Sequence, residues 1–430
     1  MRDRCTLLIS LLVLAVSLLL IRPALAQDDW EDDGNLPVEV HGFADGAFGG
    51  RLADNSAQAD DIVLGEARFR LDLAHYTDRA ELYFKGDFLT DDVVHRTHID
   101  IRQAAILLRA HERLDLRVGR QVLTWGTGDL LFVNDLFPKD FVSFFIGRDN
   151  EFLKAPSNSL KATFYSGIVN ADIAWTPVFA PDKFITGERL SFFDRSIGGL
   201  TSAAQMGGPL TVRKPDRIWE NGEFAGRLFR KISGYEVAAY GYVGFSKQPV
   251  AFDQTVAIPT FSRLAVWGAS ARGNLLGGIA NVEGAFYDSY KDRDGGNPNL
   301  PNSHIRGLLG YERELVANFT TGVQYYVERI HKHEELVASS PSAEFEPKET
   351  RHLFTIRLNQ RLRQETVTLS LFAFFSPNDE DGYARPAVSH KWSDSVTMTL
   401  GANVMWGDEY TFFGQLQDNT NVYARLRYSF

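Results

Sequence analysis

The sequence predicts an all-β protein, a transmembrane antiparallel β-barrel of about 18 strands. Three observations predict it. Runs of about nine to eleven residues alternate apolar and polar side chains, and this is the length that a tilted strand needs to cross a bilayer. Short and long connections alternate between these runs. The chain also ends on an aromatic residue within such a run, as expected where the last strand must pair with the first.

The last ten residues, 421–430, alternate most strictly. One face carries Val422, Ala424, Leu426, Tyr428 and Phe430, and the other carries Tyr423, Arg425, Arg427 and Ser429. A soluble protein rarely ends on such a strand, because an unpaired apolar edge invites aggregation. The strand resembles the C-terminal assembly signal of Gram-negative outer-membrane proteins. The resemblance implies that the barrel assembly machinery recognises the strand ending at Phe430.

The N-terminus predicts the compartment. Two arginines precede an apolar run at 7–21, and a small-residue cleavage site ending at Ala26 follows, which is the pattern of a secretory signal peptide. An uncleaved anchor helix is the alternative, but the run is short for a membrane span. We therefore expect residues 1–26 to be removed on the way to the outer membrane. The acidic segment 27–37 is then a flexible periplasmic lead-in.

Composition excludes several classes of protein. Cys5 is the only cysteine and lies in the segment predicted to be removed, so we expect no disulfide, thiol nucleophile or thiolate metal site. The formal net charge of −10 at pH 7 argues against a nucleic-acid-binding protein. The chain is rich in Phe, Tyr and Gly, which suits the aromatic girdles and closely packed strands of a barrel.

The barrel domain is predicted to cover residues 38–430. The clearest strands, 367–375 and 396–406, have an apolar residue at every second position. We predict strands at 38–49, 66–75, 80–89, 99–109, 114–121, 159–166, 169–176, 223–230, 235–244, 263–272, 278–288, 304–312, 319–328, 352–361, 366–376, 383–391, 396–406 and 421–430. Weak patterning near the N-terminus leaves about 16 strands as the alternative, because these barrels have even strand numbers.

The connections between the strands are asymmetric. Tight turns alternate with long loops, and we expect the turns in the periplasm and the loops outside the cell. Two loops, 122–158 and 177–222, are long enough to fold into the lumen. A loop in the lumen either constricts or plugs a porin. An exposed aromatic loop would instead capture an apolar solute, and the sequence does not choose between these roles.

A motif bounded by glycines ends the predicted strand 114–121. Its members are Gly119, Arg120, Gln121, Trp125 and Gly126, followed in the loop by Asp135 and Asp140. This G-R-Q-x3-W-G stretch resembles the alginate-export family and related uncharacterised outer-membrane barrels, within residues 102–140. The resemblance implies a porin-like channel with basic residues at a constriction. It does not extend to the polysaccharide substrate.

The residues of the motif support two interpretations. Glycine permits a tight or positive-φ backbone, and Arg120 can hold a carboxylate, such as Asp135 or Asp140, with two hydrogen bonds. Strict alternation points Arg120 outwards and Gln121 into the lumen, although a bulge would reverse this. The motif therefore either belongs to the channel or only folds the loop 122–158 back onto the wall.

Alternation also predicts which charged side chains face the lumen. The candidate channel-lining arginines are Arg68, Arg70, Arg117, Arg227, Arg263, Arg425 and Arg427. Acidic residues share this face, so most of these arginines are expected to pair across neighbouring strands and stiffen the wall. Arg425 and Arg427 are the best candidates for a basic patch without counter-charge. Such clusters favour anionic solutes.

These features predict an outer-membrane channel for the passive passage of a small solute, either anionic or apolar. The alternatives are a partner barrel of an export or electron-transfer complex and, after it, an outer-membrane enzyme. The sequence contains no nucleophile elbow, zincin motif or P-loop, so we expect no catalysis, cofactor, metal or nucleic acid. The expected partners are outer-membrane lipid, the assembly machinery and the solute. The sequence does not decide between a monomer and a homo-oligomer.

Overall fold

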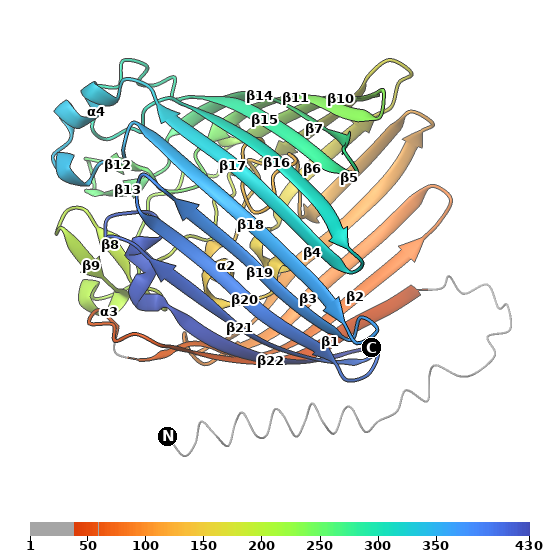
Figure 1. The fold of residues 1–430 in the computed structure, drawn as a ribbon. Helices are drawn as coiled ribbons and strands as arrows, with labels where there is room; N and C mark the ends of the chain where they lie inside the picture. The colour runs from red at the N-terminus through yellow and green to blue at the C-terminus, as the bar shows by residue number, and fades with distance from the viewer. Residues whose placement is uncertain (1–37, 59) are drawn as a thin grey trace, which may run out of the picture.

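The computed structural model describes residues 38–58 and 60–430. In this part of the chain 18 strands form one antiparallel sheet. The first strand, β1 (Val38–Arg51), pairs with both β2 (Ile62–Tyr76) and the last strand, β22 (Asn421–Ser429). The sheet therefore closes into a barrel, which Figure 1 shows from the side.

Every strand predicted from alternation is present, and the prediction of 18 strands is confirmed over the smaller number. The other wall strands are β3 (Ala80–Asp91), β4 (Arg96–His111), β5 (Leu114–Gln121), β6 (Ser157–Phe164), β7 (Asn170–Thr176), β10 (Glu223–Ile232), β11 (Tyr235–Phe245), β14 (Arg263–Leu275), β15 (Gly278–Asp288), β16 (His304–Val316), β17 (Phe319–Ile330), β18 (Thr350–Leu362), β19 (Val367–Ser376), β20 (Asp381–Lys391) and β21 (Val396–Trp406). The predicted signal peptide 1–26 and acidic segment 27–37 lie outside the described residues.

The two ends of the barrel differ, as predicted. At one end, here called the turn end, tight turns join the strands, and some place a non-glycine residue at positive φ, such as Ser233 (49°) and Asn318 (63°). At the other, the loop end, long loops contain the smaller elements (Figure 1). These are β8 (Phe192–Asp194), β9 (Gly199–Thr201), β12 (Ala251–Asp253), β13 (Ile258–Thr260), α2 (Phe141–Ile146), α3 (Ala203–Met206), α4 (His333–Ser339), η1 (Asn150–Leu153), η2 (Trp219–Asn221), η3 (Ala343–Phe345) and η4 (Gly414–Asn419). Among the described residues, no helix has the length and apolar character needed to cross a membrane.

The two faces of the wall carry different side chains. Outward positions hold large apolar residues that stay exposed, such as Leu228, Leu309 and Leu400, as a lipid-facing band requires. Inward positions near the loop end pack against loops that enter the barrel. The main cluster of buried apolar residues joins loop residues to inner-wall residues, for example Phe137 to Tyr242. The core of this protein therefore lies in the lumen, between the wall and its own loops.

Candidate functional site

Loop 122–158 lies inside the barrel, and its helix α2 is visible between the strands in Figure 1. The ring of Phe144 in α2 packs against Phe374 and Tyr383 of the inner wall, with ring centroids 6.1 and 5.4 Å apart. The Tyr383 hydroxyl donates a hydrogen bond to the Phe144 carbonyl oxygen at 3.0 Å. The loop thus occupies the lumen, which is one of the two roles left open by the sequence.

The glycine-bounded motif starts this loop and folds it back. Gly119 has a φ of 129°, and a Cβ there would lie 2.2 Å from the Ala104 carbonyl oxygen, so only glycine fits between β5 and β4. Gln121 points inwards, is fully buried, and donates to the Ser159 carbonyl oxygen at 3.0 Å. Trp125 packs on a phenylalanine of the same loop, with ring centroids 4.9 Å apart. These contacts support the loop-folding interpretation of the motif.

One carboxylate on the wall then holds the start of the loop. Gly126 has a φ of 80°, and the next two backbone N–H groups, those of Thr127 and Gly128, donate to Glu283 of β15. Glu283 also accepts from Asn134 Nδ2 at 3.0 Å. A Cβ at Gly126 would lie 3.2 Å from the carboxylate oxygens, so a larger residue would press on this acceptor. Glu283 was not among the predicted site residues.

Arg120 does not reach Asp135 or Asp140, so the prediction that it holds one of these carboxylates is wrong. Its Nε donates to a backbone carbonyl of β4, and its Nη2 lies 4.0 Å from Asp100 Oδ1. Asp135 instead forms a buried ion pair with Lys139 at 2.9 Å. Asp140 accepts from a backbone N–H of α2 and caps the start of that helix. Each carboxylate finds a nearer partner once the loop has folded, and strand alternation contains no information on that fold.

Buried ion pairs fasten the far part of the loop to the wall. Asp87 of β3 lies between Arg68 and Arg70 of β2 and pairs with both, and all three side chains are buried. Glu66 lies 3.2 Å from Arg68 and accepts from Arg148 of the loop at 3.0 Å. Unpaired charges at such depth are costly, so the position of the loop and the pairing of the wall depend on each other.

Arg425 and Arg427 have counter-charges too, so the predicted uncompensated basic patch is wrong. Arg427 lies 2.7 Å from Asp45 and 2.6 Å from Asp149, and Arg425 also pairs with Asp149. Burial raises the pKa of the Asp149 carboxyl, but the two guanidinium groups outweigh burial and hold this pKa below its ordinary value. Alternation predicts the inward direction of both arginines correctly. It does not reveal that a loop residue supplies the negative charge.

The tip of the loop, residues 148–152, continues this network. Glu151 lies 2.6 Å from Arg70, and the Phe152 ring lies under the guanidinium groups of Arg68 and Arg102, at 4.1 and 4.9 Å. The network contains six carboxylates and seven arginines, so their charges nearly cancel. The carboxylates are Asp45, Glu66, Asp87, Asp91, Asp149 and Glu151, and the arginines are Arg68, Arg70, Arg102, Arg148, Arg189, Arg425 and Arg427. This region is therefore nearly neutral.

Arg117 and Arg385 also point inwards and have no carboxylate partner among residues 38–58 and 60–430. Arg102 has none either, but it donates to the Glu151 and Lys154 carbonyl oxygens of the loop. Arg117 lies 5.2 Å from the centroid of the Tyr83 ring, and its Nε has no hydrogen-bond acceptor. Arg385 of β20, which the sequence analysis missed, donates to Asn150 Oδ1 at 2.8 Å. Its place in the alternation of the strand 383–391 was the available signal. Arg227, by contrast, pairs with a glutamate of β11 as predicted for most of the set.

Arg263 lies on the outer face of the wall, so the prediction that it lines the channel is wrong. On β14 it shares a face with Trp267, which is 58% exposed, and it donates to the Glu220 carbonyl oxygen at 3.2 Å outside the lumen. The prediction failed because Leu264 and Val266, on the opposite face, are apolar as well. They pack towards the lumen core, and alternation cannot distinguish two apolar faces.

Three loops meet at one buried carboxyl group. Asp182, from loop 177–222, accepts from the Lys139 backbone N–H at 2.7 Å and from Gln248 Nε2 at 2.7 Å. Burial raises the pKa of Asp182 to about 6, against the opposing effect of the charges on Lys139 and Lys247. Deprotonation of Asp182 therefore places a buried negative charge where the three loops meet.

We expect Asp182→Asn to stabilise the protein at neutral pH. The pKa of the folded state exceeds the ordinary 3.8, so the stability associated with this carboxyl is complete in acid and falls as the pH rises from about 4 to about 6. The free energy of unfolding lost by the wild type approaches about 3 kcal/mol. This is roughly 1.4 kcal/mol for each pH unit between the ordinary pKa of 3.8 and the folded-state pKa of about 6. Thermal unfolding of the refolded protein at several pH values measures it. A difference between wild type and variant that does not grow over this window would contradict the expectation.

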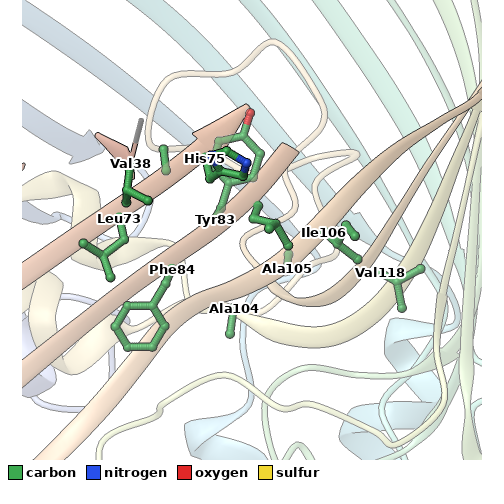
Figure 2. Close-up of a pocket in the computed structure, with 11 residues that line it drawn as sticks. Val38, Leu73, His75, Tyr83, Phe84, Ala104, Ala105, Ile106 and Val118 are labelled. Carbon is green, nitrogen blue, oxygen red and sulfur yellow. The ribbon is translucent and has the colours of Figure 1, made fainter. Parts of the chain in front are cut away.

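An apolar hollow of about 400 Å³ lies in the wall near the turn end (Figure 2). Side chains of β1 to β5 line it, including Leu73, Phe84, Ala104 and Val118. Figure 2 shows Phe84 and Ala104 on one side of the strands and Tyr83 on the other. Few polar groups converge on the hollow, unlike a typical solute site. In the described part of the chain, His and carboxylate side chains also form no group of three or more that could hold a metal ion.

Comparisons with known proteins agree with this geometry at the level of the fold. No protein-family model matches the chain, and no curated protein matches it. Among solved structures it is similar to Acinetobacter baumannii OccAB4, with a TM-score of 0.53 and 11% identity over 93% of this chain and 100% of that one. It is also similar to Pseudomonas aeruginosa OccK5 (OpdH), with a TM-score of 0.52 and 10% identity over 91% of this chain and 97% of that one. A BenF-like porin from Pseudomonas fluorescens Pf-5 is similar too, with a TM-score of 0.53 and 11% identity over 91% of this chain and 98% of that one. The chain thus has the fold of porin-like outer-membrane β-barrels.

Proposed function

We propose that this protein is an outer-membrane channel through which a small solute diffuses along a lumen narrowed by loop 122–158. The observation that carries the proposal is the attachment of this loop to separate parts of the wall. Glu283 of β15 holds its start, and Glu66, Asp87 and the neighbouring arginines hold its tip. A loop attached in this way acts as a fixed filter within the barrel. The BenF-like fold neighbour is named a porin, which supports the same role here.

The proposal includes the location and orientation of the barrel. After cleavage of the segment 1–26, the barrel lies in the outer membrane with its turn end in the periplasm and its loop end outside. The exposed apolar outer face supports contact with lipid. Phe430, whose ring stacks on Phe69 at 5.8 Å beside the closing strand pair, ends the strand that we propose the assembly machinery recognises.

The charge distribution of the lumen suggests which residues select the solute. Arg68, Arg70, Arg425 and Arg427 are neutralised by carboxylates and so act mainly in holding the loop. We propose that Arg117 and Arg385, which carboxylates do not neutralise, give the channel a preference for anionic solutes. An apolar solute is the alternative, because Phe132 and Phe141 of the loop are only partly buried.

We expect the double variant Arg117→Gln/Arg385→Gln to shift the reversal potential towards cations. A roughly twofold fall in the anion-to-cation permeability ratio corresponds to about 0.4 kcal/mol, a reasonable effect for partly screened charges. The thermal stability should change little, because no ion pair is broken and only the Arg385–Asn150 hydrogen bond and two ring contacts are lost. Arg263→Gln is the matched control, since this arginine lies on the outer face. A reversal potential that moves equally in the control and the double variant would contradict the assignment.

The experiment that tests the channel itself is single-channel recording of the refolded mature chain in a planar bilayer. We expect steady current, with ion selectivity given by the reversal potential. A barrel that is folded, as judged by its heat-dependent mobility in gels, but passes no current would overturn the proposal. Loop 122–158 would then be a plug.

The alternative functions receive less support. A partner barrel would need room in the lumen for a second protein, and the loops of this chain fill much of that space. Kinship with the alginate-export family rests on the G-R-Q-x3-W-G stretch alone, which here folds the loop through Gly119, Gln121 and Gly126. We therefore propose neither a polysaccharide cargo nor an enzymatic reaction for this protein.

A further inference from the structure

Loop 177–222 enters the barrel with one part and covers its outer face with another. In η2, near the end of the loop, the Trp219 ring stacks on Trp175 of β7, with centroids 5.3 Å apart and planes at 23°. Trp175 stacks in turn on Phe224 of β10, at 6.1 Å and 17°. Trp219 is 75% exposed and Phe224 is 54% exposed. Three rings thus form a continuous aromatic ladder on the outer face at the loop end.

A cation on the outer face lies beside this ladder. Arg263 begins β14 and donates to the Glu220 carbonyl oxygen at 3.2 Å and to the Asn221 side chain, both within or next to η2. It has no carboxylate partner among the described residues. A charged side chain on the lipid-facing side of a barrel is costly near the midplane and tolerated at the interface, where polar headgroups reach it.

Two further cations lie in the segment that precedes η2. Lys214 and Arg217 are exposed, and neither side chain takes part in an ion pair or hydrogen bond within 38–58 and 60–430. The segment is fixed against β13, the short strand before β14, because the Arg213 backbone N–H donates to the Pro259 carbonyl oxygen at 2.9 Å. Asp216 in this segment and Glu220 in η2 carry negative charge, so the three cations Lys214, Arg217 and Arg263 exceed these carboxylates by one.

We propose that this rim patch, formed by Lys214, Arg217, Trp219, Phe224 and Arg263, binds the phosphorylated headgroup of a lipid in the outer leaflet. Arginine and lysine supply donors that suit phosphate. Tryptophan prefers the membrane interface, which suits the exposed indole of Trp219 at the loop end, and the Phe224 ring is exposed on the same outer face. Basic pockets of this kind recognise anionic headgroups. The inference rests on the proposed outer-membrane location and is independent of the solute.

The test measures binding of diphosphorylated lipid A to the refolded mature chain in non-ionic detergent, by native mass spectrometry. The triple variant Lys214→Gln/Arg217→Gln/Arg263→Gln should bind about tenfold more weakly, because the charge-assisted contacts to phosphate are lost. Trp219→Ala should weaken binding several-fold. Lipid A stripped of its phosphates should bind to wild type as weakly as intact lipid A binds to the triple variant. Lys291→Gln, an exposed lysine of another loop, is the matched control and should bind like wild type.

The outcomes separate this inference from the channel proposal. Equal binding of lipid A by wild type and the triple variant would overturn the inference, as would equal binding of intact and dephosphorylated lipid A. Inorganic phosphate that competes at the same concentration as lipid A would show a free-anion site and overturn the assignment to lipid. Single-channel current of the triple variant should match wild type, since the patch lies outside the lumen. Absence of current in wild type would count against the channel and leave the lipid result standing.

Discussion

Replacing Asp87 with alanine is expected to destabilise the barrel by about 3–5 kcal/mol, which is the usual cost of leaving a buried charge without its partner. Asp87 is fully buried on β3, and it is the carboxylate that Arg68 and Arg70 share. Without it, each of the two buried guanidinium groups has one carboxylate partner left. Arg70 keeps Glu151 of the loop tip, at 2.6 Å, and Arg68 keeps Glu66, at 3.2 Å.

The consequence should extend from the wall to the loop. Glu66 also holds Arg148, so a shift of Arg68 towards Glu66 loosens the attachment of the loop tip. The unfolding midpoint, from gel mobility after heating in detergent, measures the stability. Recordings of open-channel noise measure the mobility of the loop. Asp72→Ala is the control, because Asp72 pairs with Lys85 at 3.2 Å with both side chains partly exposed, so its removal should cost less than about 1 kcal/mol. Similar midpoints for the two variants would contradict the central role of Asp87.

The wall of the barrel could be predicted from the sequence because its signal is local. Alternation predicts the inward direction of Arg425, Arg427 and Gln121 from their neighbours alone, and the structure agrees. The partners of the inward arginines could not be predicted in this way. Asp149, which neutralises Arg425 and Arg427, lies in a loop without periodicity, and its position depends on the packing of α2 against distant strands.

Errors arose where both faces of a strand are apolar. Alternation predicts Arg263 in the lumen, because the apolar residues next to it on β14 would suit either contact with lipid or contact with a core formed by loops. For Glu283 the sequence does contain a signal. Its partners across the neighbouring strands are Ser270 and Leu308, neither of them a cation. An inward carboxylate without a counter-charge on the wall indicates a partner in a loop, and Glu283 is such a carboxylate.

Glu283→Ala is expected to release the start of loop 122–158 and to raise both the conductance and the open-channel noise. The carboxylate accepts from the backbone N–H groups of Thr127 and Gly128 and from the Asn134 side chain. Each buried donor left without an acceptor costs about 1–3 kcal/mol, so the loop gains by moving these groups to water. The movement should stay local, because Gln324 still binds the Asp129 backbone N–H and carbonyl, at 2.7 and 2.8 Å.

Graded variants at this position distinguish hydrogen bonding from loss of charge. Glu283→Gln keeps one acceptor oxygen and should give an intermediate conductance, between wild type and Glu283→Ala. Glu236→Gln removes an inward carboxylate that pairs with Arg227 on the wall and does not contact the loop, so its channel noise should equal that of wild type. If Glu283→Ala keeps the wild-type conductance and noise, then apolar packing of Val133 and Phe137 in the lumen core must hold the loop instead. The constriction would then depend on close packing in the core, and large-to-small changes at those two positions would widen it.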